Sequence, residues 1–280
     1  MEICLMIEGQ EGVTWDDWLA LAAACEDHGL DGLFTSDHYL SFHGGPGRGA
    51  FDAWAVLSAL AARTETIRLG TLVSPVTFRH PSVLAKAALT VDHVSGGRIE
   101  VGMGAGWNED EHRAYGFPFP PLGERIAMLA EQLRIVHETW TEETLAHEGE
   151  HYRVGGTPGA PRPFQQPHPP LIVGGHGGPR SLDLAARWAD EYDLSGADPD
   201  DFVRVRPLLA EACEHHERDP AEVRLSWMGR VPERGDELVE RLRRYADAGV
   251  ERAYLQHLEH RDLDAVADFG RHVAPALRRA

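Results

Sequence analysis

Eight short apolar segments recur along the chain, and each is followed by a turn and a segment with the amphipathic pattern of a helix. Such alternation is typical of repeated β-strand and α-helix units, and eight units is the number that closes a parallel barrel. We therefore predict an α/β protein with a (β/α)8 TIM-barrel fold. The expected strands are residues 2–7, 32–35, 67–71, 98–102, 171–174, 191–195, 224–228 and 253–256.

Residues that start and stop helices support this reading. Thr14 is placed to cap a helix, Pro81 to occupy a first helical position, and Gly29 and Gly249 to end helices. The competing fold is a doubly wound open sheet. Its dinucleotide fingerprint is incomplete, because the glycine-rich segment 102–107 lacks the last glycine and follows the fourth expected strand.

A chain of 280 residues has the size of one α/β barrel, so we expect a single domain over residues 1–280. Residues 141–169 depart from the repeat and are rich in Gly, Pro, His and Glu. We predict that they form an insertion between the fourth helix and the fifth strand, at the carboxyl-terminal rim of the barrel, with a short hairpin around residues 151–154. Loops of this length are usually functional or form a small subdomain.

Charge and composition limit the partners and the location. The chain carries 27 Lys and Arg against 45 Asp and Glu, a net charge of −18, so its field repels nucleic acid. Its longest apolar run that we find, residues 18–25, is far shorter than the roughly 20 residues of a membrane helix. The three cysteines show no paired spacing, and residues 1–4 lack a basic export signal. We expect a cytoplasmic protein with no nucleic-acid or membrane partner.

In a TIM barrel the active site lies at the carboxyl ends of the strands, so the residues that close each strand are the first candidates. These residues combine apolar walls, one Asp beside a His, and two glycine-rich rims. Such a set suits a flat heteroaromatic ligand with a phosphate tail better than a metal cage. The candidates are Glu8, Ser36, Asp37, His38, residues 71–74, residues 104–108, residues 174–178, Ser195, Trp227, Gln256 and His257.

The strongest signal for the phosphate tail is the run Gly174-Gly175-His176-Gly177-Gly178, which leads from the fifth strand into a helix. Glycines let the backbone approach an anion closely, and free amides at a helix start bind it without a lysine. The alternative is a flexible turn with no ligand.

His38 closes the second strand, where it is expected to be a catalytic or substrate-orienting imidazole. The alternative is a hydrogen-bonded histidine beside a Ser-Asp cap. Further along, Asn108 is placed to bond a ring edge of the ligand. The acids that follow it, Glu109, Asp110 and Glu111, are expected to form the solvated first turn of a helix.

The sequence contains 16 histidines, yet their spacing does not indicate a metal site. The first strand has no His-x-His, and the adjacent His215 and His216 point in different directions on a helix. We expect no metal. No Gly-x-Ser-x-Gly elbow is present, and no cysteine has a histidine partner nearby, so covalent acyl chemistry lacks a nucleophile.

Five motifs in order resemble the bacterial luciferase-like flavin and deazaflavin oxidoreductases, particularly the branch that uses coenzyme F420. The resemblance covers about residues 1–195 and becomes a matter of barrel pattern beyond. The motifs are Ser36-Asp37-His38, Leu69-Gly70-Thr71-Leu72-Val73 with Arg79-His80-Pro81, Ser95-Gly96-Gly97-Arg98, Gly102-Met103-Gly104-Ala105-Gly106-Trp107-Asn108-Glu109 and Pro170-Leu171-Ile172-Val173-Gly174-Gly175.

The resemblance implies a barrel whose third strand ends in a non-prolyl cis peptide, here between Leu72 and Val73, that bulges against the cofactor ring. It further implies that residues 175–178 bind the cofactor phosphate and that Asp37 and Asn108 lie near the ring. His38 would transfer a proton or stabilise an intermediate. Sugar-phosphate dehydrogenases of this family carry a tryptophan where this chain has Phe42, and they use lysines that this chain lacks.

From the resemblance we predict an oxidoreductase that moves hydride between reduced deazaflavin and a small organic substrate. The substrate would be unsaturated or a carbonyl compound, and Phe42, Trp107 and Trp227 would line its pocket. An FMN-dependent monooxygenase is the alternative within the same fold, and a metal-dependent barrel hydrolase or isomerase is the alternative from another class. Family habit also suggests a homodimer.

Overall fold

The computed structural model describes residues 1–44 and 48–278 and contains a closed barrel of eight parallel strands. The predicted (β/α)8 fold is confirmed. The barrel strands are β1 (Glu2–Ile7), β2 (Gly32–Thr35), β3 (Arg68–Thr71), β5 (Ile99–Gly104), β8 (Leu171–Gly175), β9 (Glu191–Ser195), β10 (Arg224–Arg230) and β11 (Arg252–Gln256).

Pairing of the first and last strands closes the ring. β1 pairs with β11 on one side and with β2 on the other, and β3 pairs with β5. A two-residue strand, β4 (Ser74–Pro75), continues beyond β3 and pairs with the carboxyl end of β5. All of these pairings are parallel, so the carboxyl ends of the strands meet at one end of the barrel.

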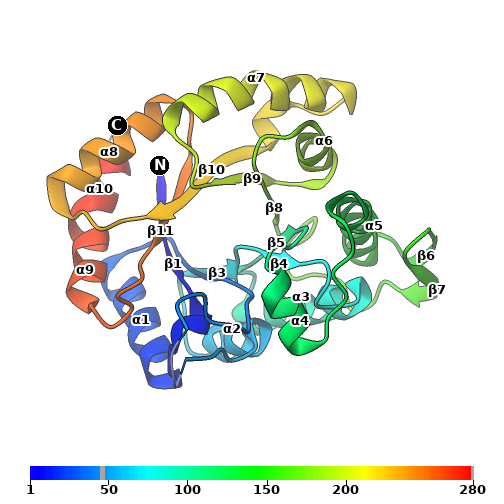
Figure 1. The fold of residues 1–280 in the computed structure, drawn as a ribbon, viewed down its shortest axis with the longest axis horizontal. Helices are drawn as coiled ribbons and strands as arrows, with labels where there is room; N and C mark the ends of the chain where they lie inside the picture. The colour runs from blue at the N-terminus through cyan, green and yellow to red at the C-terminus, as the bar shows by residue number, and fades with distance from the viewer. Residues whose placement is uncertain (45–47, 279–280) are drawn as a thin grey trace.

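Helices surround the strands (Figure 1). Apolar side chains of these helices pack against those of the strands in the main core. The helices are α1 (Trp15–His28), α2 (Ala53–Ala61), α3 (Pro81–Ser95), α4 (Glu109–Tyr115), α5 (Leu122–Thr141), α6 (Pro179–Trp188), α7 (Pro199–His215), α8 (Gly235–Asp247), α9 (Leu263–Asp268) and α10 (Ala274–Arg278), with short helical turns η1 (Gly9–Glu11), η2 (Pro220–Glu222) and η3 (Phe269–Val273).

The expected helix boundaries have the expected chemistry. Thr14 caps α1 in a capping box with Asp17, and Gly29 ends that helix in the left-handed conformation. Pro81 is the first residue of α3. Capping side chains, a proline and a glycine therefore mark where these helices begin and end.

Side chains from alternate strand positions fill the lumen of the barrel. Its apolar members are Cys4, Met6, Phe34, Leu72, Ile172 and Tyr254, packed against Val73 and Met228. The larger apolar core lies outside the lumen, between the strands and the helices.

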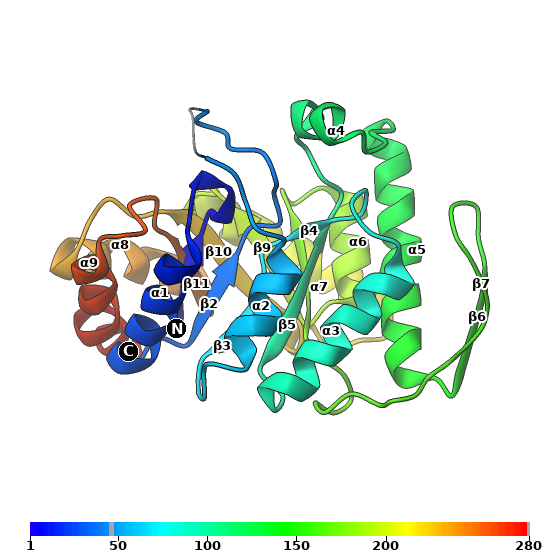
Figure 2. The same cartoon turned by 90° about the horizontal axis from the view of Figure 1, so that it is seen from below.

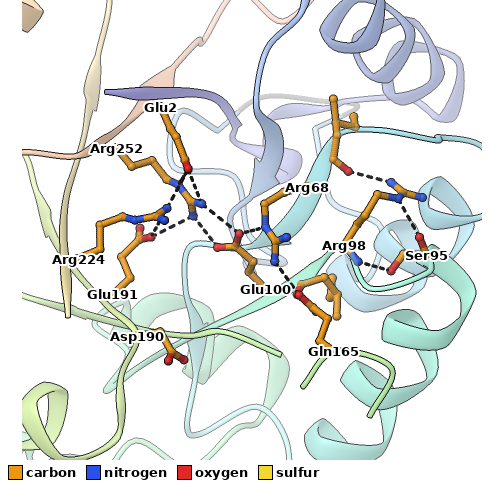
Figure 3. A network of polar contacts seen from close by, with 12 residues as sticks. Glu2, Arg68, Ser95, Arg98, Glu100, Gln165, Asp190, Glu191, Arg224 and Arg252 are labelled. Atoms are coloured by element: carbon orange, nitrogen blue, oxygen red, sulfur yellow. Dashed lines mark hydrogen bonds and ion pairs between the residues drawn. The ribbon is translucent and has the colours of Figure 1, made fainter. Parts of the chain in front are cut away.

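The amino-terminal end of the lumen is filled by charged groups rather than apolar ones (Figure 3). Arg252 is buried and forms ion pairs with Glu100 and Glu191, at 2.5 and 3.0 Å, and with Glu2. Arg68 also pairs with Glu100. The network ties together five of the strands at the end of the barrel opposite the candidate site.

The insertion is a two-stranded antiparallel hairpin, β6 (Thr144–Glu148) and β7 (Arg153–Pro158). It lies along the outer side of α5, where Leu145 and Val154 pack on Ile135 (Figure 2). The expected position at the carboxyl-terminal rim is therefore wrong. The connection follows a helix, and helix-to-strand connections leave from the amino-terminal end of the barrel strands. No helix in the described residues is long and apolar enough to cross a membrane.

Candidate active site

His38 lies just beyond the carboxyl end of β2 and is held by a carboxylate from α4. Its Nδ1 is 2.7 Å from Oε2 of Glu111, whose side chain has no exposed surface. The other oxygen of Glu111 accepts hydrogen bonds from the backbone amides of Tyr39 and Leu40. The loop after β2 and the first turn of α4 are thus joined through one buried carboxylate.

No feature of the sequence singles out Glu111, and the expectation of a solvated first turn is wrong for this residue. Glu109 and Asp110 are exposed, whereas Glu111 is buried. The three acids look alike in the sequence because all lie in the first turn. Glu111 differs only through a partner 73 residues earlier in the chain, and no local pattern contains that information.

Two aromatic side chains surround the histidine. The rings of Phe42 and Trp107 lie 4.8 and 5.7 Å from the His38 ring, and 5.0 Å from each other. Phe42 is 39% exposed and Trp107 63% exposed, so the group is open to solvent on one side. Residues from two separate segments, the loop after β2 and the segment after β5, were chosen from the sequence as site candidates and form one cluster.

Asp37 faces β4 and the segment that leads into α3. It is buried and accepts hydrogen bonds from Ser74 and Arg79, and Arg79 also binds Asp52. Burial raises the pKa of Asp37, although Arg79 and Ser74 oppose that shift. Its second oxygen, Oδ1, is buried with no hydrogen-bond partner among the described residues. Such an atom is one that a bound ligand can satisfy.

A cluster of polar side chains from the ends of three strands lies at the same end of the barrel. Glu8 accepts hydrogen bonds from the side-chain amides of Gln10 and Gln256, at 2.8 and 2.5 Å. Ser36 in turn donates to the Gln10 carbonyl oxygen at 2.7 Å. Glu8, Ser36 and Gln256 were expected from the strand-end rule, and Gln10 was not.

Two positions in the glycine run after β8 favour glycine, one because of a neighbouring side chain and one because of its backbone conformation. A Cβ on Gly175 would collide with the hydroxyl of Tyr192, and Gly177 has a φ of 73°, which favours glycine. The amide of Gly177 donates to Tyr192 Oη at 2.9 Å, so it is not free as expected. Among the described residues, the amides of His176 and Gly178 have no acceptor, and α6 starts directly after them.

Trp227 is placed away from this site. It is 1% exposed, packs against Tyr245 of α8 with the two ring centroids 4.5 Å apart, and donates through Nε1 to the backbone carbonyl of Ala197. Along β10 alternate residues face opposite sides, and Met228 faces the lumen. Trp227 therefore belongs to the outer core and does not line a pocket at the carboxyl end.

Asn108 is the N-cap residue of α4, the helix that carries Glu111. Its side chain caps α4 by accepting a hydrogen bond from the Glu111 amide at 3.3 Å. This bond places α4 so that Glu111 meets His38. Among the described residues, no group of three or more His, Cys, Asp or Glu side chains is arranged to hold a metal ion.

A comparison with known families gives the relation of this chain to other proteins. The model of the family described as luciferase-like monooxygenase matches residues 3–276. The chain belongs to this family.

One relative in the luciferase-like family is an F420-dependent glucose-6-phosphate dehydrogenase of Nakamurella multipartita. It is 40% identical over 198 residues, which cover 69% of this chain and 57% of the relative. Several other curated relatives are also matched over little more than half of their length.

Two solved structures share the fold. An F420-dependent secondary alcohol dehydrogenase in complex with an F420-acetone adduct has a TM-score of 0.87 and 18% identity, over 99% of both chains. A coenzyme F420-dependent tetrahydromethanopterin reductase from Methanopyrus kandleri has a TM-score of 0.82 and 18% identity, over 98% of this chain and 99% of that one.

The feature expected from the luciferase-like resemblance at the third strand is present. The peptide bond between Leu72 and Val73 is cis. Leu72 is part of the lumen cluster, and the Val73 side chain occupies the space that Cβ atoms on Gly102, Gly104 and Gly174 would need. Three glycines on β5 and β8 therefore make room for the turn that follows β3.

Proposed function

We propose that this protein is an oxidoreductase that binds coenzyme F420 at the carboxyl end of the barrel and exchanges hydride between that cofactor and a small organic substrate. The observation that carries the proposal is the position of His38. Its Nδ1 is bound to a buried carboxylate, and its Nε2 has no hydrogen-bond partner among the described residues and lies beside an open aromatic cluster. The names of the F420-dependent relatives support the choice of cofactor.

The residues at the barrel mouth fit a cofactor of this kind. Asp37 offers a buried oxygen that lacks a partner in the described part of the chain, and it is the residue next to His38. The amides of His176 and Gly178, followed by the first turn of α6, offer a site for a phosphate without a lysine. Leu72 and Val73, which face the lumen, would contact the ring system, and Asn108 would border it.

When bound, the deazaflavin supplies the hydride chemistry. The protein then has to orient the substrate, exclude water and move one proton. His38 Nε2 would exchange that proton with the substrate oxygen or carbon. Phe42 and Trp107 would contact the substrate through their exposed faces and keep water from it.

A sugar phosphate does not suit this site. Lys86 is the only lysine of the chain, and its Nζ donates to the backbone carbonyl of Ala160, between α3 and the segment after β7. Phe42 also has no indole N–H to offer where the sugar-phosphate enzymes carry tryptophan. We propose an uncharged carbonyl compound, alcohol or unsaturated compound as substrate.

His38→Ala tests the proposal. F420 affinity should stay within about threefold of the original, because His38 is proposed to transfer a proton and not to bind the cofactor. Turnover should fall by roughly 100-fold or more. His215→Ala, which changes an exposed histidine on α7, is the control. Unchanged turnover in His38→Ala would remove the proposed role. Turnover that needs FMN and oxygen would favour the monooxygenase alternative.

Two further expectations remain predictions. The three cysteines are buried and unpaired, which supports a reducing compartment such as the cytoplasm. A homodimer is expected from family habit alone, and light scattering of the purified protein measures it directly.

A further inference from the structure

The Glu111 carboxylate has two oxygens with different partners. One oxygen, Oε1, accepts hydrogen bonds from the amides of Tyr39 and Leu40, and the other, Oε2, faces His38 Nδ1 at 2.7 Å. Backbone amides can only donate. The orientation of the carboxyl group is therefore fixed by the backbone of the loop after β2.

The charge on this group is also fixed. Burial disfavours the ionised form, but the hydrogen bonds from His38 and from the amides of Leu40 and Tyr39 outweigh it and lower the pKa of Glu111. The neighbouring acids have other partners: Asp37 binds Ser74 and Arg79, and Glu11 binds Ser41, Arg48 and the Phe42 amide. At neutral pH His38 thus faces an ionised carboxylate, which can only accept hydrogen bonds.

We propose that Glu111 is a positioning residue that fixes the tautomer of His38, so that Nδ1 always carries a hydrogen and all proton exchange with the substrate runs through Nε2. The identity of the reaction rests on the proposed function above. The tautomer itself does not, because it follows from the contacts of the protein alone.

The consequence for the reaction is a defined proton path. When an alcohol is oxidised, its carbinol carbon gives up a hydride to the cofactor and its hydroxyl proton passes to Nε2. The products are a carbonyl compound, the reduced cofactor and an imidazolium ion paired with Glu111. In the reverse direction the same Nε2–H returns the proton to the carbonyl oxygen. Neutral His38 is thus the base and protonated His38 the acid.

Glu111→Gln is a sharp test, because the geometry dictates how the glutamine sits. Its carbonyl oxygen has to face the amides of Tyr39 and Leu40, so its NH2 group faces His38 Nδ1. An NH2 group donates, and Nδ1 then has to become the acceptor. The variant should hold neutral His38 with its hydrogen on Nε2, the wrong nitrogen for a base.

Nitrogen NMR of histidine-labelled protein without cofactor measures this directly. The His38 signals are assigned by their loss in His38→Gln. In its neutral form, His38 of the original protein should show hydrogen on Nδ1, and Glu111→Gln should show it on Nε2. Hydrogen on Nε2 in the original protein overturns the proposal even if the variant fails to fold.

Activity gives the second readout. Glu111→Gln should lower kcat for alcohol oxidation by roughly 100-fold or more, with F420 affinity unchanged. Glu109→Gln removes the same charge from the same helix turn, where the side chain is exposed, and should leave kcat and the tautomer unchanged. A Glu111→Gln enzyme with the pH profile and kcat of Glu109→Gln would overturn the positioning role. If instead F420 does not bind but the tautomer changes as expected, the proposed function fails and the assignment of Glu111 stands.

Discussion

Asp193 is a buried carboxyl group in the lumen, on the same side of β9 as Glu191. It accepts hydrogen bonds from Ser195 at 2.6 Å and Ser226 at 3.4 Å. Burial, helped by the nearby Glu191, raises its pKa to about 7 against the opposing serine hydrogen bonds. A carboxyl group whose pKa is higher in the folded state than in the unfolded state binds its proton more tightly when folded. The protein therefore loses stability as the pH rises from about 4 to about 7.

Asp193→Asn should remove this pH dependence. The amide keeps the size of the side chain and carries no charge, so the variant should be more stable than the original by roughly 2–4 kcal/mol at pH 8. The difference should shrink towards pH 5, where Asp193 is already protonated. Urea unfolding at the two pH values measures it. Asp200→Asn, on the exposed start of α7, is the control. A variant that is less stable than the original at pH 8 would show that the Asp193 charge is compensated.

Some site residues could be identified from the sequence, and others could not. His38, Phe42 and Trp107 were found because each lies at a strand end or in a family motif, and the structure brings them together. The pocket position predicted for Trp227 was wrong. A residue's place at a strand end gives its level along the barrel axis, but not whether its side chain faces the lumen or the surrounding helices. Either side of β10 reads as apolar, since Trp227 and Met228 are neighbours.

At the scale of elements, Arg252 joins β11 to its surroundings at the amino-terminal end of the lumen (Figure 3). Its side chain is 3% exposed and its acidic partners Glu100 and Glu191 are 2% and 4% exposed. Removing one member of a buried ion pair leaves charges without compensation, which costs more than the pair itself contributes. This one guanidinium group therefore couples β11 to β1, β5 and β9.

Arg252→Met should lower the free energy of unfolding by about 3–5 kcal/mol, because Glu100 and Glu191 lose their shared partner. Arg224→Ala is the matched control. Arg224 pairs with Glu2 at 2.8 Å and more distantly with Glu191, at 3.7 Å, but it is about one third exposed, so its loss should cost about 1 kcal/mol or less. Urea unfolding of both variants gives the comparison. Equal stability of the two variants would contradict the coupling.

The elements themselves were largely readable from sequence. The expected strand at residues 191–195 has the observed bounds, and that at 98–102 ends two residues early because the glycines of β5 hid its continuation. The hairpin of the insertion was predicted from the sequence, but its position along the outer side of α5 was not. Its place depends on Leu145 and Val154 meeting Ile135 of α5, and such a long-range contact has no local sequence signature.

For the whole molecule, eight strand-end loops bring distant segments to one mouth, while the charged network occupies the other end. Periodicity predicts that arrangement, because closure of eight parallel strands leaves few alternatives. The chemistry at the mouth depends on contacts such as that between His38 and Glu111, and it had to be read from the structure.

Calorimetric titration of the purified protein with coenzyme F420, and separately with FMN, tests the central claim most directly. F420 should bind saturably at one molecule per chain and at least about tenfold more tightly than FMN, a difference of about 1.4 kcal/mol. Tight binding of FMN together with no measurable binding of F420 would contradict the account.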